Sequence, residues 1–185
     1  NLAGGESHVR QFLYGKRFFM DEFGVNVRIG MLPDTFGFTW NLPQIMKKSG
    51  IEMWVTPKLE SNDTIRWPYD GPVIWQGADG TQIPTYKLKH SYASGIDAGQ
   101  LRITLDYPAS IGLKESIHFY GEGDHGGGPN PGDVDAIHNV NATCEFTAVA
   151  GTIVDYWDNY LASHLDKLQV YNNELYLQYH RGVYT

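Results

Sequence analysis

The sequence has a single cysteine, no long hydrophobic run and no cluster of basic residues. Cys144 has no partner for an internal disulfide, so nothing in the sequence indicates an oxidising compartment. No apolar run reaches the roughly 18 residues that a membrane-spanning helix requires, and no signal peptide is recognisable. A net charge of −7 without a run of Lys or Arg argues against binding to nucleic acid or to an anionic membrane surface.

What the sequence does contain is a large apolar and aromatic fraction. Its 185 residues fit a single domain, residues 1–185, and 42% of them are hydrophobic, which is enough to bury a sizeable core. The chain has 12 Tyr and 5 Trp, and such side chains line sugar sites as well as cores. The first residue is Asn rather than Met, and we therefore expect a piece of a longer chain.

The order of the predicted helices and strands indicates an α/β fold. A helix is predicted over residues 6–23, where apolar residues recur at three- and four-residue steps until Gly24 ends the pattern. A strand over 25–32, a helix over 42–49 and a strand over 51–56 form a βαβ unit, whose strands run parallel. The patterns further predict a β-hairpin from 73–76 and 81–87, a strand at 117–120, a helical turn at 133–138, an amphipathic helix over 152–165 and a last strand over 175–180. Over 101–116 the signals are mixed, because Pro108 and Gly112 would interrupt a long helix.

Three of the predicted strands end in polar residues. Asp34, Asp124 and His180 each follow an apolar run, and a Gly follows each of them within three residues. Because α/β proteins bind ligands at the carboxyl ends of their strands, these residues predict a shared site on one rim. Each also has an ordinary interpretation. Asp34 fits a turn or a helix cap, Asp124 fits a mobile Gly-rich loop, and His180 fits a half-buried histidine.

Short motifs spread along the chain occur in the same order in a known enzyme family. They are Glu6-Ser7-x-Val9-Arg10-Gln11-Phe12, Leu32-Pro33-Asp34-x-Phe36-Gly37, Leu42-Pro43-Gln44-Ile45, Lys48-Ser49-Gly50-Ile51, Gly121-x-Gly123-Asp124 with Gly126-Gly127-Gly128-Pro129, and Glu174-Leu175-Tyr176-Leu177 with His180-Arg181-Gly182 and Tyr184-Thr185. With these motifs the chain resembles the α-mannosidases of glycoside hydrolase family 38, and the last two blocks resemble the cytosolic and microbial branch. The resemblance covers most of the chain, apart from residues 88–115 and 130–170.

The resemblance implies a partial α/β barrel and a retaining glycosidase that uses zinc (Zn²⁺) to release terminal α-mannosyl residues. Asp34 matches the family's nucleophile, which is also a zinc ligand, and His180 matches another zinc ligand. A retaining enzyme needs a second carboxyl group about 5–5.5 Å from the nucleophile to protonate the leaving oxygen. Asp124 is our candidate for this acid/base, because its Gly-rich loop can approach the leaving group.

Further expectations concern the substrate and the partners of the protein. We expect Phe36 to pack under the sugar, and Arg181 and Tyr184 to bind the substrate as well. Mannose-containing oligosaccharides are the implied substrates of a cytoplasmic protein that binds neither nucleic acid nor membranes. Two protein partners stay open, namely further copies of this chain and the remainder of a longer chain.

The chain departs from the family at two points. The family takes two more zinc ligands from a His-x-Asp motif upstream of the block that starts here, so these 185 residues alone should bind zinc poorly and be inactive. His125 stands where the family usually has Gly, and its Cβ restricts the loop. Two other functions stay open: a carbohydrate-binding remnant without catalysis, and a metal-dependent deacetylase on a similar barrel, which would use a metal-bound water.

Overall fold

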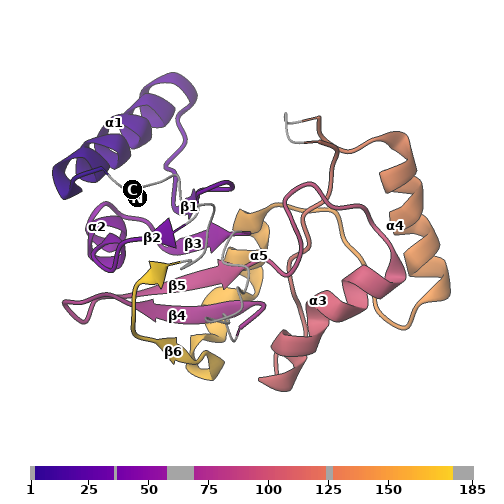
Figure 1. Cartoon of the computed structure of the whole chain (residues 1–185). Helices are drawn as coiled ribbons and strands as arrows, with labels where there is room; N and C mark the ends of the chain where they lie inside the picture. The colour runs from indigo at the N-terminus through magenta and orange to yellow at the C-terminus, as the bar shows by residue number, and fades with distance from the viewer. Residues whose placement is uncertain (1–2, 36, 58–68, 124–126, 177–185) are drawn as a thin grey trace. The chain divides into compact units, whose positions relative to one another are not determined.

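The computed structural model describes residues 3–35, 37–57, 69–123 and 127–176 of the chain. Figure 1 shows helices and a sheet along this mixed α/β chain. The chain divides into two compact units, one formed by Asn1–Lys87 with Leu168–Thr185 and the other by Leu88–Lys167. The assignment of residues 1–185 to one domain stays a prediction.

The first unit is built around a five-stranded sheet. In the order of the sheet, its strands are β1 (Ile29–Met31), β3 (Met53–Thr56), β5 (Gln82–Lys87), β4 (Pro72–Gln76) and β6 (Val170–Tyr171). β1, β3 and β5 run parallel, whereas β4 pairs antiparallel with β5 and parallel with β6. The predicted α/β class, the parallel βαβ unit and the hairpin are therefore confirmed.

The two helices of this unit match the predicted ones. α1 (Gly5–Phe23) ends at Gly24, whose φ of 65° lies in the left-handed region where Gly is favoured. α2 (Leu42–Lys48) carries Pro43 in its first turn, where the missing N–H of a proline removes no helical hydrogen bond. Gly50 follows α2 with a φ of 76°, as its position after the predicted helix suggests.

The turn of the β4–β5 hairpin is organised by one carboxylate. Asp79 accepts hydrogen bonds from the backbone N–H of Thr81 at 3.0 Å and from its hydroxyl at 2.8 Å. These bonds, and a further one from the Gln44 amide of α2 at 2.6 Å, hold the pKa of Asp79 below its ordinary value. The hairpin turn is thus tied to helix α2 as well as to its own strands.

The core of the first unit is apolar on both faces of the sheet. Strand β3 is buried along its whole length, as is typical of parallel strands that are covered on both sides. The ring of Phe38 lies edge-on to Trp54 and Trp75, with centroid distances of 5.3 and 6.5 Å. Around these rings pack the buried side chains of Leu42, Met46, Ile51, Ile83 and Leu175.

In its described residues the second unit contains three α-helices, which sequence patterns predicted only in part. They are α3 (Ala98–Ser110), α4 (Pro131–Thr143) and α5 (Ile153–Asn159), and 3₁₀ turns follow at Leu161–Ser163 and Leu165–Lys167. Asn130 and Thr152 each open a helix with a capping box. α4 is longer than the helical turn predicted at 133–138, and the helix predicted over 152–165 ends at Asn159.

The strand predicted at 117–120 is not formed. This segment has no ladder partner among the described residues, and it is held instead through a side chain. His118 Nε2 lies 2.8 Å from the carbonyl oxygen of Gly95, and Nδ1 lies 3.4 Å from the hydroxyl of Thr104 on α3. The mixed signals around Pro108 also have an explanation, because α3 ends two residues after this proline.

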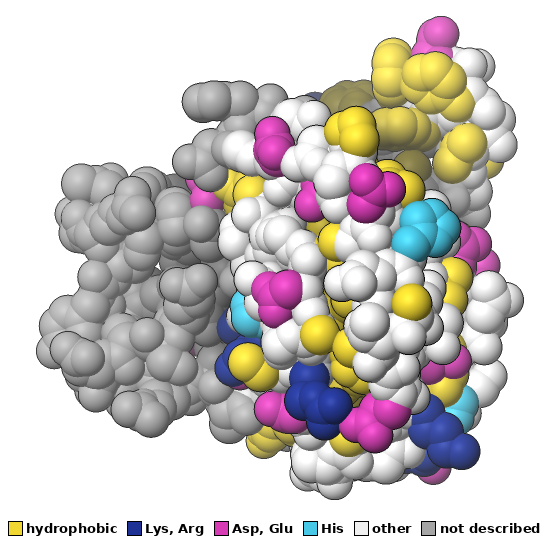
Figure 2. All heavy atoms as spheres, turned by 90° about the vertical axis from the view of Figure 1, so that its right-hand side faces the viewer, with side chains coloured by type: hydrophobic (Ala, Val, Ile, Leu, Met, Phe, Trp, Pro, Cys, Tyr) yellow, Lys and Arg dark blue, Asp and Glu magenta, His cyan; other side chains and the backbone are white. Residues whose placement is uncertain are grey.

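None of the helices in the described ranges is long and apolar enough to cross a membrane. On the face drawn in Figure 2, Asp and Glu side chains are spread among uncharged ones, and Lys and Arg do not merge into one patch.

The stability of the fold should fall in mildly acidic solution because of His118. Burial lowers the pKa of this side chain from its ordinary value of 6.5. The hydrogen bond with the Gly95 carbonyl opposes this shift, the charge of His90 adds to it, and the carboxylate of Asp97 opposes it. The unfolded chain therefore binds more protons than the folded one below about pH 6.5, so the free energy of unfolding decreases as pH falls from there toward the folded pKa. Urea unfolding of the wild type and of His118→Gln at several pH values checks this. A variant that keeps the full pH dependence would contradict the assignment.

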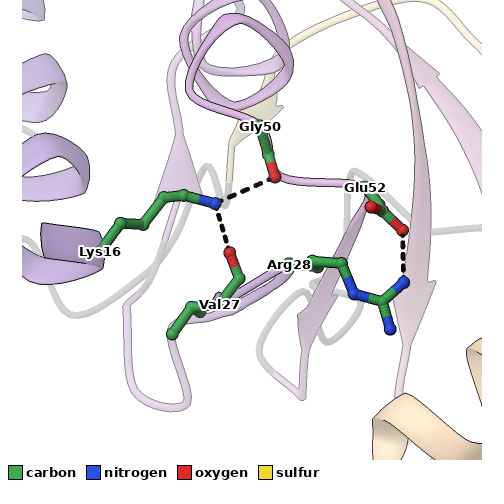
Figure 3. Close-up of polar contacts among 5 residues, drawn as sticks. All are labelled: Lys16, Val27, Arg28, Gly50 and Glu52. Atoms are coloured by element: carbon green, nitrogen blue, oxygen red, sulfur yellow. Dashed lines mark hydrogen bonds and ion pairs between the residues drawn. The ribbon is translucent and has the colours of Figure 1, made fainter. Parts of the chain in front are cut away.

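Lys16 should hold α1 on the sheet. Figure 3 shows its ammonium donating hydrogen bonds to the carbonyl oxygens of Val27 and Gly50, beside the ion pair of Arg28 Nη1 with Glu52 Oε2 at 2.9 Å. Burial lowers the pKa of Lys16, and the Glu52 carboxylate opposes this effect.

Replacing Lys16 by Met leaves both carbonyls without this donor, which should cost about 1–3 kcal/mol of unfolding free energy. The neighbouring Arg17→Met variant is the matched control. It removes an exposed pair with Asp21, which contributes about 0.5 kcal/mol or less. Denaturant unfolding measures the loss of unfolding free energy in both variants. Equal losses would show that the two hydrogen bonds of Lys16 stabilise the fold no more than the exposed Arg17–Asp21 pair does.

Candidate active site

Asp34 lies directly after β1, at the carboxyl end of the parallel strands. The chain leaves β1 at Met31 and turns at Pro33 and Asp34, whose side chain is exposed. At the end of the adjacent strand β3, the hydroxyl of buried Thr56 donates a hydrogen bond of 3.4 Å to the carbonyl oxygen of Leu32. The turn is therefore attached to the sheet, and Asp34 lies on its exposed side.

A short antiparallel ribbon connects this turn with a distant part of the chain. After Asp34 the chain enters β2 (Gly37–Phe38), which pairs with β7 (Leu175–Tyr176). Gly37 lies opposite Tyr176, and Phe38 lies opposite Leu175. Asp34 precedes this ribbon by three residues, and His180 follows it by four. Two strands far apart in the sequence are thus paired, and each lies within four residues of a predicted zinc ligand along the chain.

The ribbon is attached to the core by side chains from both of its strands. Phe38 and Leu175 are 2% and 1% exposed and belong to the aromatic cluster around Trp54. The indole N–H of Trp75 donates to the carbonyl oxygen of Asn173 at 2.8 Å, just before β7. Sequence patterns missed this arrangement, because strands of two residues show no periodicity.

The Gly-rich segment closes into a loop at its two ends. The N–H of Glu122 donates to the Gly128 carbonyl, and the N–H of Gly127 donates to the Glu122 carbonyl, both at 2.9 Å. A Cβ on Gly127 would lie 2.6 Å from the Glu122 oxygen, so only Gly fits there. These hydrogen bonds hold the two ends of the segment close together. The prediction that Asp124 follows a strand, as Asp34 does, was wrong, because residues 117–120 form no strand.

Most of the predicted site residues cannot be placed. Asp34 lies among the described residues, whereas the other predicted residues lie outside them: Phe36, Asp124, His180, Arg181 and Tyr184. Within the described ranges, no group of three or more His, Cys, Asp or Glu side chains could hold a metal ion. The donor types of Asp34 and His180, a carboxylate oxygen and an imidazole nitrogen, are nevertheless ones that zinc accepts.

The sequence did not predict a partly buried ion pair at the same end of the sheet. Lys87 Nζ lies 2.8 Å from Asp70 Oδ1, and the side chain of Lys87 is 6% exposed while that of Asp70 is 31% exposed. Lys87 ends β5 and lies opposite Thr56, the last residue of β3. A lysine at the end of an apolar strand was the available signal, but its partner could not be inferred without the fold.

A parallel sheet that presents a carboxylate beyond the end of a strand is the layout of many α/β enzymes. Residues 1–174 match the N-terminal domain of glycosyl hydrolases family 38, and the chain belongs to this family. It is 36% identical to alpha-mannosidase G of Dictyostelium discoideum and 33% identical to alpha-mannosidase 2C1 of Homo sapiens, each over 187 residues. These matches cover 100% of this chain but only 17% and 18% of the relatives.

A solved structure shows the same fold. The crystal structure of an alpha-mannosidase from Enterococcus faecalis V583 superposes with a TM-score of 0.68 at 21% sequence identity. The superposition covers 94% of this chain and 20% of that chain. The chain therefore spans less than a fifth of the curated relatives it matches and a fifth of the solved structure.

Removing either partner of the Lys87–Asp70 pair should destabilise the fold, but by different amounts. Asp70→Asn leaves a buried ammonium without its carboxylate, which should cost about 3–5 kcal/mol of unfolding free energy. Lys87→Met should cost less, because the Asp70 carboxylate that remains is partly exposed. The double variant should recover part of the loss. Denaturant unfolding of the three variants measures the order, and a larger loss in Lys87→Met than in Asp70→Asn would contradict it.

Proposed function

We propose that this chain is part of the catalytic domain of a zinc-dependent, retaining α-mannosidase that releases terminal α-mannosyl residues from oligosaccharides. Membership of family 38 and the α-mannosidase relatives support hydrolysis of mannosides. Because the chain spans less than a fifth of those relatives, we assign the activity to a longer protein and expect these 185 residues alone to be inactive.

The proposed reaction uses two carboxyl groups. The carboxylate of Asp34 attacks the anomeric carbon while the glycosidic C–O bond breaks, and the carboxylic acid of Asp124 protonates the leaving oxygen. In the second step Asp124 takes a proton from water, which displaces Asp34 and releases mannose with retained configuration. The accessible position of Asp34 after β1, on a turn attached to the sheet, supports its role.

Asp34 and His180 are also the proposed zinc ligands, and the pairing of β2 with β7 is the observation that carries this assignment. In the antiparallel pair, Gly37, three residues after Asp34, lies opposite Tyr176, four residues before His180. When bound, zinc would orient sugar hydroxyls and polarise the surroundings of the reacting carbon.

Three further residues have proposed roles in substrate binding. We assign Phe36, which lies between Asp34 and the ribbon in sequence, to the apolar face of the sugar. Arg181 and Tyr184 would donate hydrogen bonds to its hydroxyls.

Asp34→Asn in the longer protein tests the nucleophile. It should lower hydrolysis of an aryl α-mannoside by more than about 1,000-fold, because an amide neither attacks the anomeric carbon nor leaves it. Asp21→Asn, on the exposed surface of α1, is the matched control and should keep full activity. Zinc content measured on the same proteins should fall in Asp34→Asn only.

A fluorinated mannoside that traps the covalent intermediate separates the remaining functions. An adduct on the peptide containing Asp34 is expected, whereas a deacetylase using a metal-bound water would form none. Undiminished turnover in Asp34→Asn, or an adduct on another residue, would overturn the assignment. Binding of mannosides without any turnover in the longer wild-type protein would favour a non-catalytic carbohydrate-binding role.

A further inference from the structure

The Gly-rich loop over residues 121–128 has few side chains that could fix its position. Five of its eight residues are Gly, and Gly loses more conformational freedom on ordering than any other residue does. Among the described residues of the loop, Glu122 alone has a Cβ. Its carboxylate is therefore the one side-chain group of these described residues that can attach the loop to the rest of the second unit.

The carboxylate of Glu122 is bound from the start of helix α4. The side-chain amide of Asn130 donates a hydrogen bond from Nδ2 to Glu122 Oε1 at 2.5 Å. A hydrogen bond to an ionised carboxylate is shorter and stronger than one between neutral groups. The backbone of Glu122 already bonds to Gly127 and Gly128, so this contact adds a side-chain bond to the backbone bonds that join the two ends of the loop.

The helix fixes the orientation of the Asn130 amide. Its Oδ1 accepts a hydrogen bond from the N–H of Asp133 at 3.1 Å, and the backbone N–H of Asn130 donates to Asp133 Oδ2 at 2.9 Å. Because the capping box occupies Oδ1, Nδ2 is the atom that faces Glu122. Asp caps a helix as well as Asn does, but an ionised Asp has no donor for a second carboxylate.

The loop is also attached just before Glu122. The N–H of Gly121 donates a hydrogen bond to the carbonyl oxygen of Ser94 at 3.1 Å. Asp124 itself lies outside the described residues, but it follows Glu122 by two residues, and two residues span at most about 7 Å of chain. A contact that fixes Glu122 therefore limits the positions from which Asp124 can act.

We propose that Asn130 and Glu122 are positioning residues, and that the hydrogen bond between them holds the Gly-rich loop where Asp124 can protonate the leaving oxygen of the glycoside. Neither residue touches the reacting atoms; both act through Asp124. The inference rests on the acid role proposed for Asp124, so its test includes a variant of Asp124 as well as variants of the two positioning residues.

Asn130→Asp in the longer protein removes the donor while keeping the helix cap. The introduced carboxylate can still accept from the N–H of Asp133, but it faces the Glu122 carboxylate with like charge. The kcat/KM for phenyl α-mannoside, whose leaving oxygen needs a proton, should fall at least about tenfold. The kcat/KM for 2,4-dinitrophenyl α-mannoside, whose leaving group departs without a proton, should fall less than about twofold.

The double variant Asn130→Asp with Glu122→Gln exchanges donor and acceptor in the same contact. The amide then lies at position 122 and the carboxylate at position 130, so a hydrogen bond can form again. We expect the kcat/KM for phenyl α-mannoside to return to within about threefold of the wild type. A loss as large as in Asn130→Asp alone would contradict a role for this hydrogen bond.

Asn141→Asp, on the same helix, is the matched control. Asn141 Nδ2 donates to the carbonyl oxygen of Ala148 at 2.9 Å, and its Oδ1 accepts from the N–H of Ala148 at 2.7 Å. The substitution thus removes one amide donor and keeps one accepted bond, as Asn130→Asp does. It should lower the thermal unfolding midpoint but leave the ratio of the two kcat/KM values unchanged. The same change of ratio as in Asn130→Asp would assign the effect to the stability of α4 and overturn the proposal.

Asp124→Asn separates a failure of the acid role from a failure of the positioning. It should reduce hydrolysis of phenyl α-mannoside at least as much as Asn130→Asp does, and again spare the dinitrophenyl substrate. Equal rates of Asp124→Asn and the wild type on both substrates would overturn the acid role, and the positioning with it. A selective loss in Asp124→Asn together with unchanged rates in Asn130→Asp would keep the acid role and overturn the positioning alone.

Discussion

The burial of Phe38 and Leu175 against two tryptophans is the contact on which the candidate site depends. β2 and β7 contribute two residues each, and a ribbon so short has too few hydrogen bonds to persist in water by itself. Full burial of a Phe or Leu side chain contributes about 1.5–3 kcal/mol, so these two residues outweigh the backbone pairing they accompany. The ribbon exists because its side chains belong to the core around Trp54 and Trp75.

This dependence links stability to function through geometry. The turn with Asp34 precedes one strand of the ribbon in sequence, and His180 follows the other. Loosening of the core should therefore also weaken the pairing of β2 with β7. The buried polar residues at the same end of the sheet, Thr56 and Lys87, add attachments that do not require the ribbon. The turn with Asp34 and the ribbon that follows it are thus attached both to an apolar core and to polar contacts of the sheet.

Local signals account for what the sequence predicted correctly. Helical periodicity ended by Gly24, a proline in the first turn of α2, and a Gly/Asp turn between apolar runs are all properties of a few adjacent residues. The same apolar-run criterion failed at 117–120, because whether such a run becomes a strand depends on a partner elsewhere in the chain. The β2–β7 ribbon and the Lys87–Asp70 pair were missed for the same reason, since both join distant segments.

The apolar side of α1 also depends on distant parts of the fold, because they decide whether it is buried, although the pattern itself is recognised from adjacent residues. Periodicity predicted the helix and its apolar side, and the helix is present, but on that side only Phe12 packs against the core cluster and the other large apolar side chains are exposed. A pattern of apolar residues reflects the environment in which a sequence was selected, and it persists when that environment is not part of the chain. Among the described residues α1 adds only Phe12 to the core cluster, so the packing of these residues does not account for the rest of its apolar pattern.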